Sequence, residues 1–238
     1  MIGIDGNHYP RHDDVWIVIP AFNEATVISD VVADVRSVFD HVVVVDDGSR
    51  DATAERAWQA GAHVVRHPVN LGQGAAIQTG VEYARSQPGA AVFATFDADG
   101  QHRVQDVLRM IKRLESEDLD IVVGTRFADS APVDMPLLRR LLFPLLAKLS
   151  PASRRLGLTD AHNGLRVFNR TVADGLELTM NGMAHASEII AEIVDNGWRV
   201  AEEPVEILYT DYSMSKGQPL VNGVNIVFDG LLRKRMRR

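Results

Sequence analysis

The sequence contains no cysteine among its 238 residues. Disulfide bonds, thiolate metal sites and thiol catalysis are therefore excluded, and any metal ion must be held by oxygen or histidine ligands. The sequence also lacks an apolar run near the roughly 18 to 20 residues that span a bilayer. The polar start through Asp14 has no apolar core of a signal peptide. These absences predict a cytoplasmic protein.

Positive charge is in deficit over most of the chain. The sequence has 25 Lys and Arg against 32 Asp and Glu, a net charge of -7, which argues against a nucleic-acid partner. The last six residues, Arg233 to Arg238, nevertheless hold five cations and no acid. Such a local excess predicts contact with an anionic membrane surface.

Apolar residues are well represented, at 46% of the chain, as a globular protein requires. From Val15 to Arg126, short β-branched runs alternate with segments of helical periodicity, which predicts βαβ units on a mostly parallel sheet. The expected strands are 16–19, 42–45, 63–65, 91–96 and 121–123, followed by 165–168 and a strand region at 199–208; expected helices include 27–38, 107–114 and 186–194.

Three of the expected strands end in polar residues: 20–24, 46–49 and 97–99. Ligands of open α/β sheets bind beyond the carboxyl ends of the strands, so we expect these segments to converge. Asp97 and Asp99 would emerge together in a tight turn, and two carboxylates so placed suit a hard divalent cation that also binds phosphate. Asp46 or Asp47 is a candidate to accept the N–H of a nucleobase.

The loop Asn70-Leu71-Gly72-Gln73-Gly74 precedes an expected helix and could bring backbone N–H groups to an anion. It lacks the Gly-Lys-Ser/Thr ending of a P-loop. Three histidines, His102, His162 and His185, lack the i, i+4 spacing of a helical zinc site, and we expect them to form hydrogen bonds.

Six segments in this order resemble family-2 glycosyltransferases of the GT-A fold, especially polyprenyl-phosphate sugar transferases of the dolichol-phosphate mannose synthase type. They are Ile19-Pro20-Ala21-Phe22-Asn23-Glu24, Val44-Val45-Asp46-Asp47-Gly48-Ser49, Asn70-Leu71-Gly72-Gln73-Gly74, Phe96-Asp97-Ala98-Asp99-Gly100-Gln101-His102, Gly124-Thr125-Arg126-Phe127 and Asp160-Ala161-His162-Asn163-Gly164-Leu165-Arg166. The resemblance implies an α/β fold with a single GT-A (Rossmann-like) domain over 15–212, preceded by an extension (1–14) and followed by a mobile loop and an amphipathic basic segment (213–238).

The resemblance also implies a set of donor-binding residues. The nucleotide of a UDP- or GDP-sugar would contact Pro20, Phe22, Glu24, Val44, Asp46, Asp97 and Ala98, with Asp46 reading the base. Asp97, Asp99 and Gln101 would hold Mg²⁺ or Mn²⁺. The physical logic agrees, because a cation stabilises the negative charge that develops on the departing nucleoside diphosphate.

Three residues are implied to be catalytic: Arg126 and Lys216 near phosphate groups, and Asp160 as a candidate base. An alternative for Asp160 is to orient Arg166 or a substrate hydroxyl, because the oxygen of a phosphate acceptor is already anionic. Glu188 falls where other family-2 enzymes keep an acidic base, but we expect it to be a helix-surface carboxylate. The sequence departs from the mannose synthases near Thr210, where those enzymes carry an arginine.

The function that this resemblance implies is inverting transfer of a sugar to a polyprenyl phosphate at the cytoplasmic face of the membrane. Peripheral docking would use the apolar and cationic segment Leu137–Leu149, the C-terminal segment, or a small membrane protein as partner. The alternatives are a lipid-linked glycan or soluble small molecule as acceptor, a nucleotidyltransferase, or a non-catalytic protein that binds nucleotide sugars.

Overall fold

A computed structural model describes residues 12–126, 155–160, 163–180 and 184–208. In this part of the chain, seven strands form one sheet in the order β3-β2-β1-β4-β6-β5-β7. The strands are β1 (Val15–Ala21), β2 (His41–Asp46), β3 (His63–Arg66), β4 (Val92–Thr95), β5 (Ile121–Thr125), β6 (Arg166–Asn169) and β7 (Val200–Pro204). Strand β6 runs antiparallel to both β4 and β5, and the other pairs are parallel. The expected α/β fold with a mostly parallel sheet is confirmed.

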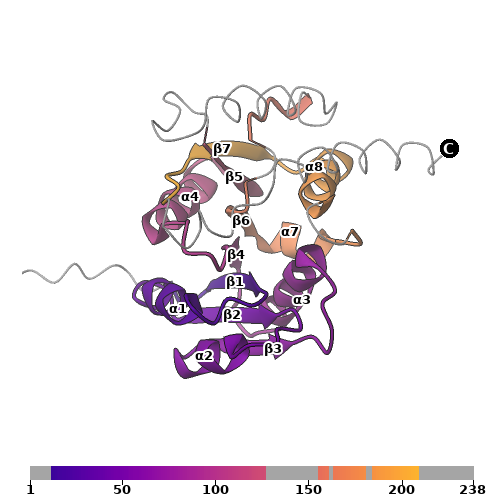
Figure 1. Cartoon of the computed structure of the whole chain (residues 1–238). Coiled ribbons are helices and arrows are strands. Elements are labelled where there is room, and N and C mark those ends of the chain that lie inside the picture. Colours follow the sequence, from indigo (N-terminus) through magenta and orange to yellow (C-terminus); the bar gives the residue numbers. More distant parts are fainter. Residues whose placement is uncertain (1–11, 127–154, 161–162, 181–183, 209–238) are drawn as a thin grey trace, which may run out of the picture.

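Helices cover both faces of the sheet (Figure 1). One face carries α1 (Ile28–Arg36), α2 (Thr53–Gln59) and α4 (Val104–Ser116), and the other carries α3 (Gln73–Arg85), α7 (Arg170–Gly175) and α8 (His185–Asn196). Strands sandwiched in this way must be apolar on both sides, which explains why their sequences read as continuous β-branched runs.

Alternate side chains of each central strand enter two separate cores. Ile17 and Ile19 of β1 pack with Val44 beneath α1 and α4, whereas Trp16 and Val18 pack on the opposite side with α3 and α8. All five side chains are at most 3% exposed. The two cores hold the central strands rigidly, so the residues just beyond the strand ends have a fixed frame.

The structure confirms the strands expected near 16, 42, 63, 91, 121 and 165 to within two residues. The last expected strand region is shorter than predicted: β7 stops at Pro204, which pairs with Thr125, the last residue of the neighbouring strand β5. Among the helices in the described ranges, none is long and apolar enough to cross a membrane. The segments 137–149 and 213–238 lie outside the described residues.

Candidate functional site

A cavity of about 430 Å³ lies beyond the carboxyl ends of β1, β2 and β4. Its lining combines the three polar strand ends with the start of α3, the turn before β6 and the start of α8. The lining residues are Pro20, Ala21, Phe22, Glu24, Asp47, Asn70, Gly72, Gln73, Ala76, Asp97, Ala98, Asp99, Gly164, Arg166, His185 and Ala186. The expected convergence of these segments is confirmed.

Asp97 is held in place from two sides. Its Oδ2 lies 3.0 Å from Nε2 of His102, and its Oδ1 accepts a hydrogen bond of 3.2 Å from Nε2 of Gln73. Burial alone would raise the pKa of Asp97, but the hydrogen bond and charge of His102 and the nearby Arg166 guanidinium outweigh it and lower that pKa. Asp97 is therefore ionised at neutral pH, and His102 has the hydrogen-bonding role expected from the sequence.

Gly164 allows the turn at 163–165 to pass close to Asp97. A Cβ atom on Gly164 would lie 2.2 Å from Oδ2 of Asp97, which is closer than any real contact. Only a residue without a side chain therefore lets the 163–165 turn pass over the carboxylate. This close passage brings β6 to the cavity.

Asp99 shares the cavity with Asp97 and titrates differently. Burial and the negative charge of Asp97 raise the pKa of Asp99 to about 6. Its Oδ1 accepts a hydrogen bond of 3.1 Å from the backbone N–H of Gln101. The described residues contain no group of three or more acidic or histidine side chains placed to hold a metal ion.

These two carboxylates fit a divalent cation that completes its coordination with substrate oxygens. Mg²⁺ typically uses one or two protein carboxylates together with phosphate oxygens and water. A cation between Asp97 and Asp99 would also relieve the repulsion that raises the pKa of Asp99. The side chain of Gln101 is not part of the cavity lining, so its role as a further ligand stays a prediction.

Asp46 is the last residue of β2, and Asp47 follows it. The structure brings Asp47 to the cavity and turns Asp46 away. Asp46 is fully buried; its Oδ1 accepts the backbone N–H of Ser49, and its Oδ2 lies 3.1 Å from Nε of Arg66. Val44 is likewise fully buried in a core and does not line the cavity. Neither Asp46 nor Val44 lines the cavity, so their assignment to the nucleotide stays a prediction.

Asp47 organises the glycine-bearing loop before α3. Its Oδ1 accepts the backbone N–H of Leu71 and its Oδ2 accepts that of Gly72, each at 2.8 Å. These N–H groups were expected to face a bound anion, but in the structure Asp47 is that anion. His67 completes the arrangement, with Nδ1 2.7 Å from Oδ1 of Asp47 and Nε2 3.0 Å from Oγ1 of Thr79.

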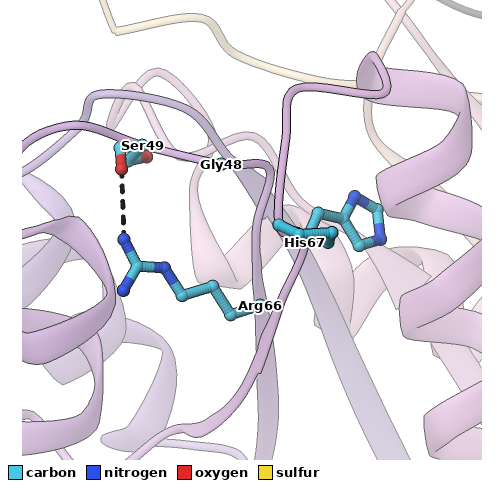
Figure 2. Close-up of a pocket in the computed structure, with 5 residues that line it drawn as sticks. Gly48, Ser49, Arg66 and His67 are labelled. Carbon is cyan, nitrogen blue, oxygen red and sulfur yellow. Dashed lines mark hydrogen bonds between the residues drawn. The ribbon is translucent and has the colours of Figure 1, made fainter.

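A second cavity, of about 330 Å³, lies on the other side of the 46–49 turn and is lined by Gly48, Ser49, Arg66, His67 and Pro68. Figure 2 shows the Arg66 side chain reaching to Ser49, whose carbonyl accepts a hydrogen bond of 3.2 Å, while the His67 ring points away from Arg66. Arg66 is well exposed, with 60% of its side chain accessible. None of the described residues that line this second cavity carries a carboxylate, in contrast to the cavity around Asp97.

Arg126 and Asp160 form a bidentate ion pair. Nε and Nη2 of Arg126 lie 2.6 and 2.8 Å from the two carboxylate oxygens of Asp160, whose Oδ2 also accepts the Arg126 backbone N–H. Asp160 is buried, whereas 21% of the Arg126 side chain is exposed. A carboxylate so engaged is poorly placed to accept a further proton, so the geometry favours a positioning role for Asp160 over that of a base. Its hydrogen-bonded arginine is Arg126, whereas the expected alternative named Arg166.

Glu188 is not the surface carboxylate that was expected. It is 1% exposed, and it accepts hydrogen bonds from the backbone N–H groups of Thr179 and Met180 and from the Thr179 hydroxyl. The prediction was wrong because Glu188 lies on the inner face of α8, where the preceding segment folds back over it. Lys216 lies outside the described residues, and its predicted role stays a prediction.

The sequence-based predictions gave the Gln73 side chain no role and considered Arg166 only as a partner of Asp160. Gln73 binds Asp97 from the start of α3, and Arg166, the first residue of β6, is 1% exposed in the cavity wall. Arg166 could have been suspected from its place in an otherwise apolar strand, since arginine is seldom fully buried without a partner.

Comparison with known proteins adds independent evidence. The model of the family "Glycosyl transferase family 2" matches residues 16–176. The chain is 28% identical to the UDP-N-acetylglucosamine–dolichyl-phosphate N-acetylglucosaminyltransferase of Methanococcus voltae, over 92% of this chain and 96% of the relative. It is 26% identical to the polyprenol monophosphomannose synthase of Mycolicibacterium smegmatis, over 88% and 82% of the two chains.

A solved structure confirms the fold. Glucosyl-3-phosphoglycerate synthase from Mycobacterium tuberculosis, crystallised with Mn²⁺, UDP and glucosyl-3-phosphoglycerate, superposes with a TM-score of 0.68 at 21% identity, covering 91% of this chain and 76% of the other. The matched family segment contains β1, except for its first residue, β2 to β6 and most of the cavity lining. The chain belongs to glycosyl transferase family 2.

Proposed function

We propose that this glycosyltransferase moves a sugar from a nucleotide-sugar donor to a polyprenyl phosphate, with inversion at the anomeric carbon. The observation that carries the proposal is the cavity in which Asp97 and Asp99 meet Arg166 at the carboxyl edge of the sheet. Of two relatives similar over more than four fifths of this chain, one is named for transfer to dolichyl phosphate and the other for synthesis of polyprenol monophosphomannose, which supports the same acceptor class here.

The donor would lie across the cavity. Pro20, Phe22, Glu24 and Ala98 line it as the resemblance implied, and Phe22 is 44% exposed, so its ring is accessible to a base or a sugar. Asp47 takes the place of Asp46 as the candidate reader of the base, because Asp47 lines the cavity. A carboxylate has about four acceptor positions, and Oδ2 of Asp47 accepts one hydrogen bond from the described residues, which leaves room for a base N–H.

Asp97 and Asp99 would hold Mg²⁺ or Mn²⁺ against the donor diphosphate, with Gln101 as a proposed further ligand. When bound, the cation neutralises charge on the leaving nucleoside diphosphate. His102 and Gln73 fix the Asp97 carboxylate by hydrogen bonds at 3.0 and 3.2 Å. This preorganisation reduces the rearrangement needed when the diphosphate departs.

The acceptor phosphate supplies its own nucleophile. One of its oxygens forms a bond to the anomeric carbon while the bond from that carbon to the β-phosphate oxygen breaks, and the electron pair leaves with the nucleoside diphosphate. An ionised phosphate needs no base for this step, which agrees with an Asp160 that is already bound to Arg126. The partly exposed Arg126 would contact the acceptor phosphate, and Lys216 would provide a second cation.

A polyprenyl acceptor requires that the enzyme work at a membrane surface. We propose peripheral binding at the cytoplasmic face, through the basic cluster Arg233–Arg238, the segment Leu137–Leu149 or a small membrane partner. Each basic residue near an anionic leaflet contributes on the order of 1 kcal/mol. The C-terminal cluster contains five cations, so together they would contribute about 5 kcal/mol.

The test is a transfer assay with labelled UDP- and GDP-sugars and Mg²⁺ or Mn²⁺. Four acceptors are compared: polyprenyl phosphate in micelles, the polyprenol without phosphate, a lipid-linked glycan and 3-phosphoglycerate. We expect lipid-soluble label with polyprenyl phosphate alone, in the anomeric configuration opposite to that of the donor. Asp97→Asn should abolish it, and Asp174→Asn, on the distant surface of α7, should not. Label on another acceptor, or on none, would refute the acceptor assignment.

A further inference from the structure

The position of Arg166 follows from the direction of β6. Because β6 is antiparallel to its neighbours, its first residue lies at the edge where they end: Arg166 pairs with Thr95, the last residue of β4, and with Val123 of β5. A parallel strand in the same place would put its last residue there instead. The single reversed strand of the described sheet thus brings an arginine to the carboxyl edge, beside Asp97.

The guanidinium of Arg166 has hydrogen-bond donors to spare. Its Nη1 donates one long hydrogen bond, of 3.4 Å, to the carbonyl oxygen of Gly164. Nε and Nη2 are buried and have no hydrogen-bond partner among the residues that the structure describes. A buried charged group without partners is costly, so a ligand that completes its hydrogen bonds would bind here with a favourable free energy.

The charges around the cavity indicate which kind of ligand. Four carboxylates line it, those of Glu24, Asp47, Asp97 and Asp99, and Arg166 is the one arginine or lysine among its described lining residues. Burial lowers the pKa of Arg166 to about 10, while the charges of Asp97 and Asp160 act in the opposite direction. The guanidinium is therefore fully charged at neutral pH and is the natural protein contact for an anion.

We propose that Arg166 binds substrate phosphate in this cavity, through hydrogen bonds from Nε and Nη2 to two phosphate oxygens. The planar fork of a guanidinium matches such a pair of oxygens. The inference rests on the proposed function for the identity of the phosphate, and the nucleoside diphosphate of the donor is favoured because Arg166 lies beside Asp97. The phosphate of the lipid acceptor is the other source, and the experiment separates the two.

A purely structural role would look different. An arginine that serves to neutralise buried acids donates hydrogen bonds to them, as Arg126 does to Asp160. No carboxylate in the described part of the chain accepts a hydrogen bond from Arg166. Its charge acts on Asp97 and Asp160 through space, while the N–H groups of Nε and Nη2 stay unused.

The test is calorimetric titration of the full chain and its Arg166→Met variant with UDP, GDP, inorganic pyrophosphate, a short-chain polyprenyl phosphate in micelles, and the matching nucleosides. Arg170→Met, just past the other end of β6, is the matched control, since Arg170 pairs with Asp174 on the surface. We expect Arg166→Met to weaken binding of the preferred nucleoside diphosphate by about 10- to 100-fold. Nucleoside binding should not change, and Arg166→Lys should fall between the two.

A second readout separates ligand binding from folding. Because Arg166 is buried without partners for two of its nitrogens, Arg166→Met should keep or raise the melting temperature of the ligand-free protein, whereas loss of a structural ion pair would lower it. Weakening confined to the polyprenyl phosphate would assign Arg166 to the acceptor. If the full chain binds pyrophosphate more tightly than Arg166→Met does, but neither chain binds a nucleotide, the inference would be upheld and the proposed nucleotide-sugar donor would be contradicted. Equal binding of every phosphate probe by both chains, or binding of none, would overturn it.

Discussion

Both carboxylate oxygens of Asp160 are held by the guanidinium of Arg126, at 2.6 and 2.8 Å, although the two residues are 34 positions apart along the chain. Glu202 of β7 supports the pair by accepting the backbone N–H of Asp160 at 2.9 Å. Arg126 follows β5 and Asp160 precedes β6, so the pair connects the ends of two adjacent strands. From this relationship we propose that Asp160 is a positioning residue for Arg126.

The first prediction concerns this pair. Asp160→Asn should raise the KM for the acceptor by about 10- to 100-fold, because loss of a charged hydrogen-bond partner costs roughly 1.5 to 3 kcal/mol. The pH profile of kcat should keep its shape. The effects of Asp160→Asn and Arg126→Met should be strongly non-additive in a double-mutant cycle. A lost basic limb in the pH profile would instead identify Asp160 as the catalytic base.

The second prediction concerns Asp99 and pH. Its folded-state pKa of about 6 lies above the ordinary value of 3.8, so the folded state holds more protons than the unfolded state between these values. Stability contributed by protonated Asp99 is therefore present below pH 4 and is lost as the pH rises to about 6. Asp99→Asn should stabilise the metal-free protein at pH 7 by roughly 1 to 2 kcal/mol, after allowance for partial exposure.

Denaturant unfolding at pH 4 and pH 7 in the presence of a chelator measures this effect. The gain of Asp99→Asn should be larger at pH 7, while transfer activity is abolished. Equal stability of the two chains at pH 7 would show that Asp99 carries no such electrostatic cost.

The third prediction concerns Gly164. Its Cβ position lies 2.2 Å from Oδ2 of Asp97, so Gly164→Ala must displace the carboxylate or the turn, at a cost of about 1 to 3 kcal/mol. Activity per folded molecule should fall by at least tenfold. Gly89→Ala is the control, because Gly89 has a φ of 79° but no neighbour within 4 Å. Gly89→Ala should lower stability and leave activity unchanged. Full activity of Gly164→Ala would show that Asp97 need not keep its position.

The fourth prediction concerns His67, which is joined to Asp47 at 2.7 Å. His67→Leu removes a buried hydrogen bond to a carboxylate and should weaken binding of the preferred nucleoside diphosphate by about tenfold, since such a bond contributes about 1 to 3 kcal/mol. His67→Gln, which retains a donor, should recover part of the affinity. Titration calorimetry on both variants decides: unchanged affinity in His67→Leu would mean that Asp47 needs no such support.

The fifth prediction concerns the basic cluster Arg233–Arg238, which lies outside the described residues. A chain that ends at Gly230 should float less well with anionic liposomes than the full chain, and the difference should shrink with rising salt, because the attraction is electrostatic. Neutral liposomes provide the control. Equal flotation of both chains with anionic liposomes would assign membrane binding to another part of the protein.

Much of the fold could be predicted from the sequence because the central strands are buried on both faces. The run at 92–96, apolar except for Thr95, is typical of such a strand, and it places Asp97 and Asp99 at a strand end from the order of residues alone. That Asp47 rather than Asp46 lines the cavity has a reason that no local pattern reveals. Which of two adjacent aspartates faces the cavity depends on where the turn after β2 meets the loop before α3, and that contact joins Asp47 to Leu71 and Gly72.

The place of Arg166 beside Asp97 could not be predicted from the sequence, for a topological reason. A sequence pattern identifies a strand but not its direction, and with β6 parallel the same arginine would lie at the opposite edge of the sheet. The antiparallel pairing with Thr95 is a property of the whole sheet. The Glu188 error has a similar origin, because only the tertiary path of residues 179–180 buries that carboxylate.

The most direct test of the central claim, that the cavity around Asp97 and Asp99 is the donor site, is thermal unfolding with UDP, GDP, dTDP and their sugars, with and without Mn²⁺. A ligand at 100 times its dissociation constant stabilises by about 2.7 kcal/mol. We predict a metal-dependent rise in melting temperature for one nucleotide class that is absent in Asp99→Ala. No rise with any nucleotide, or an equal rise in Asp99→Ala, would contradict the assignment of the cavity.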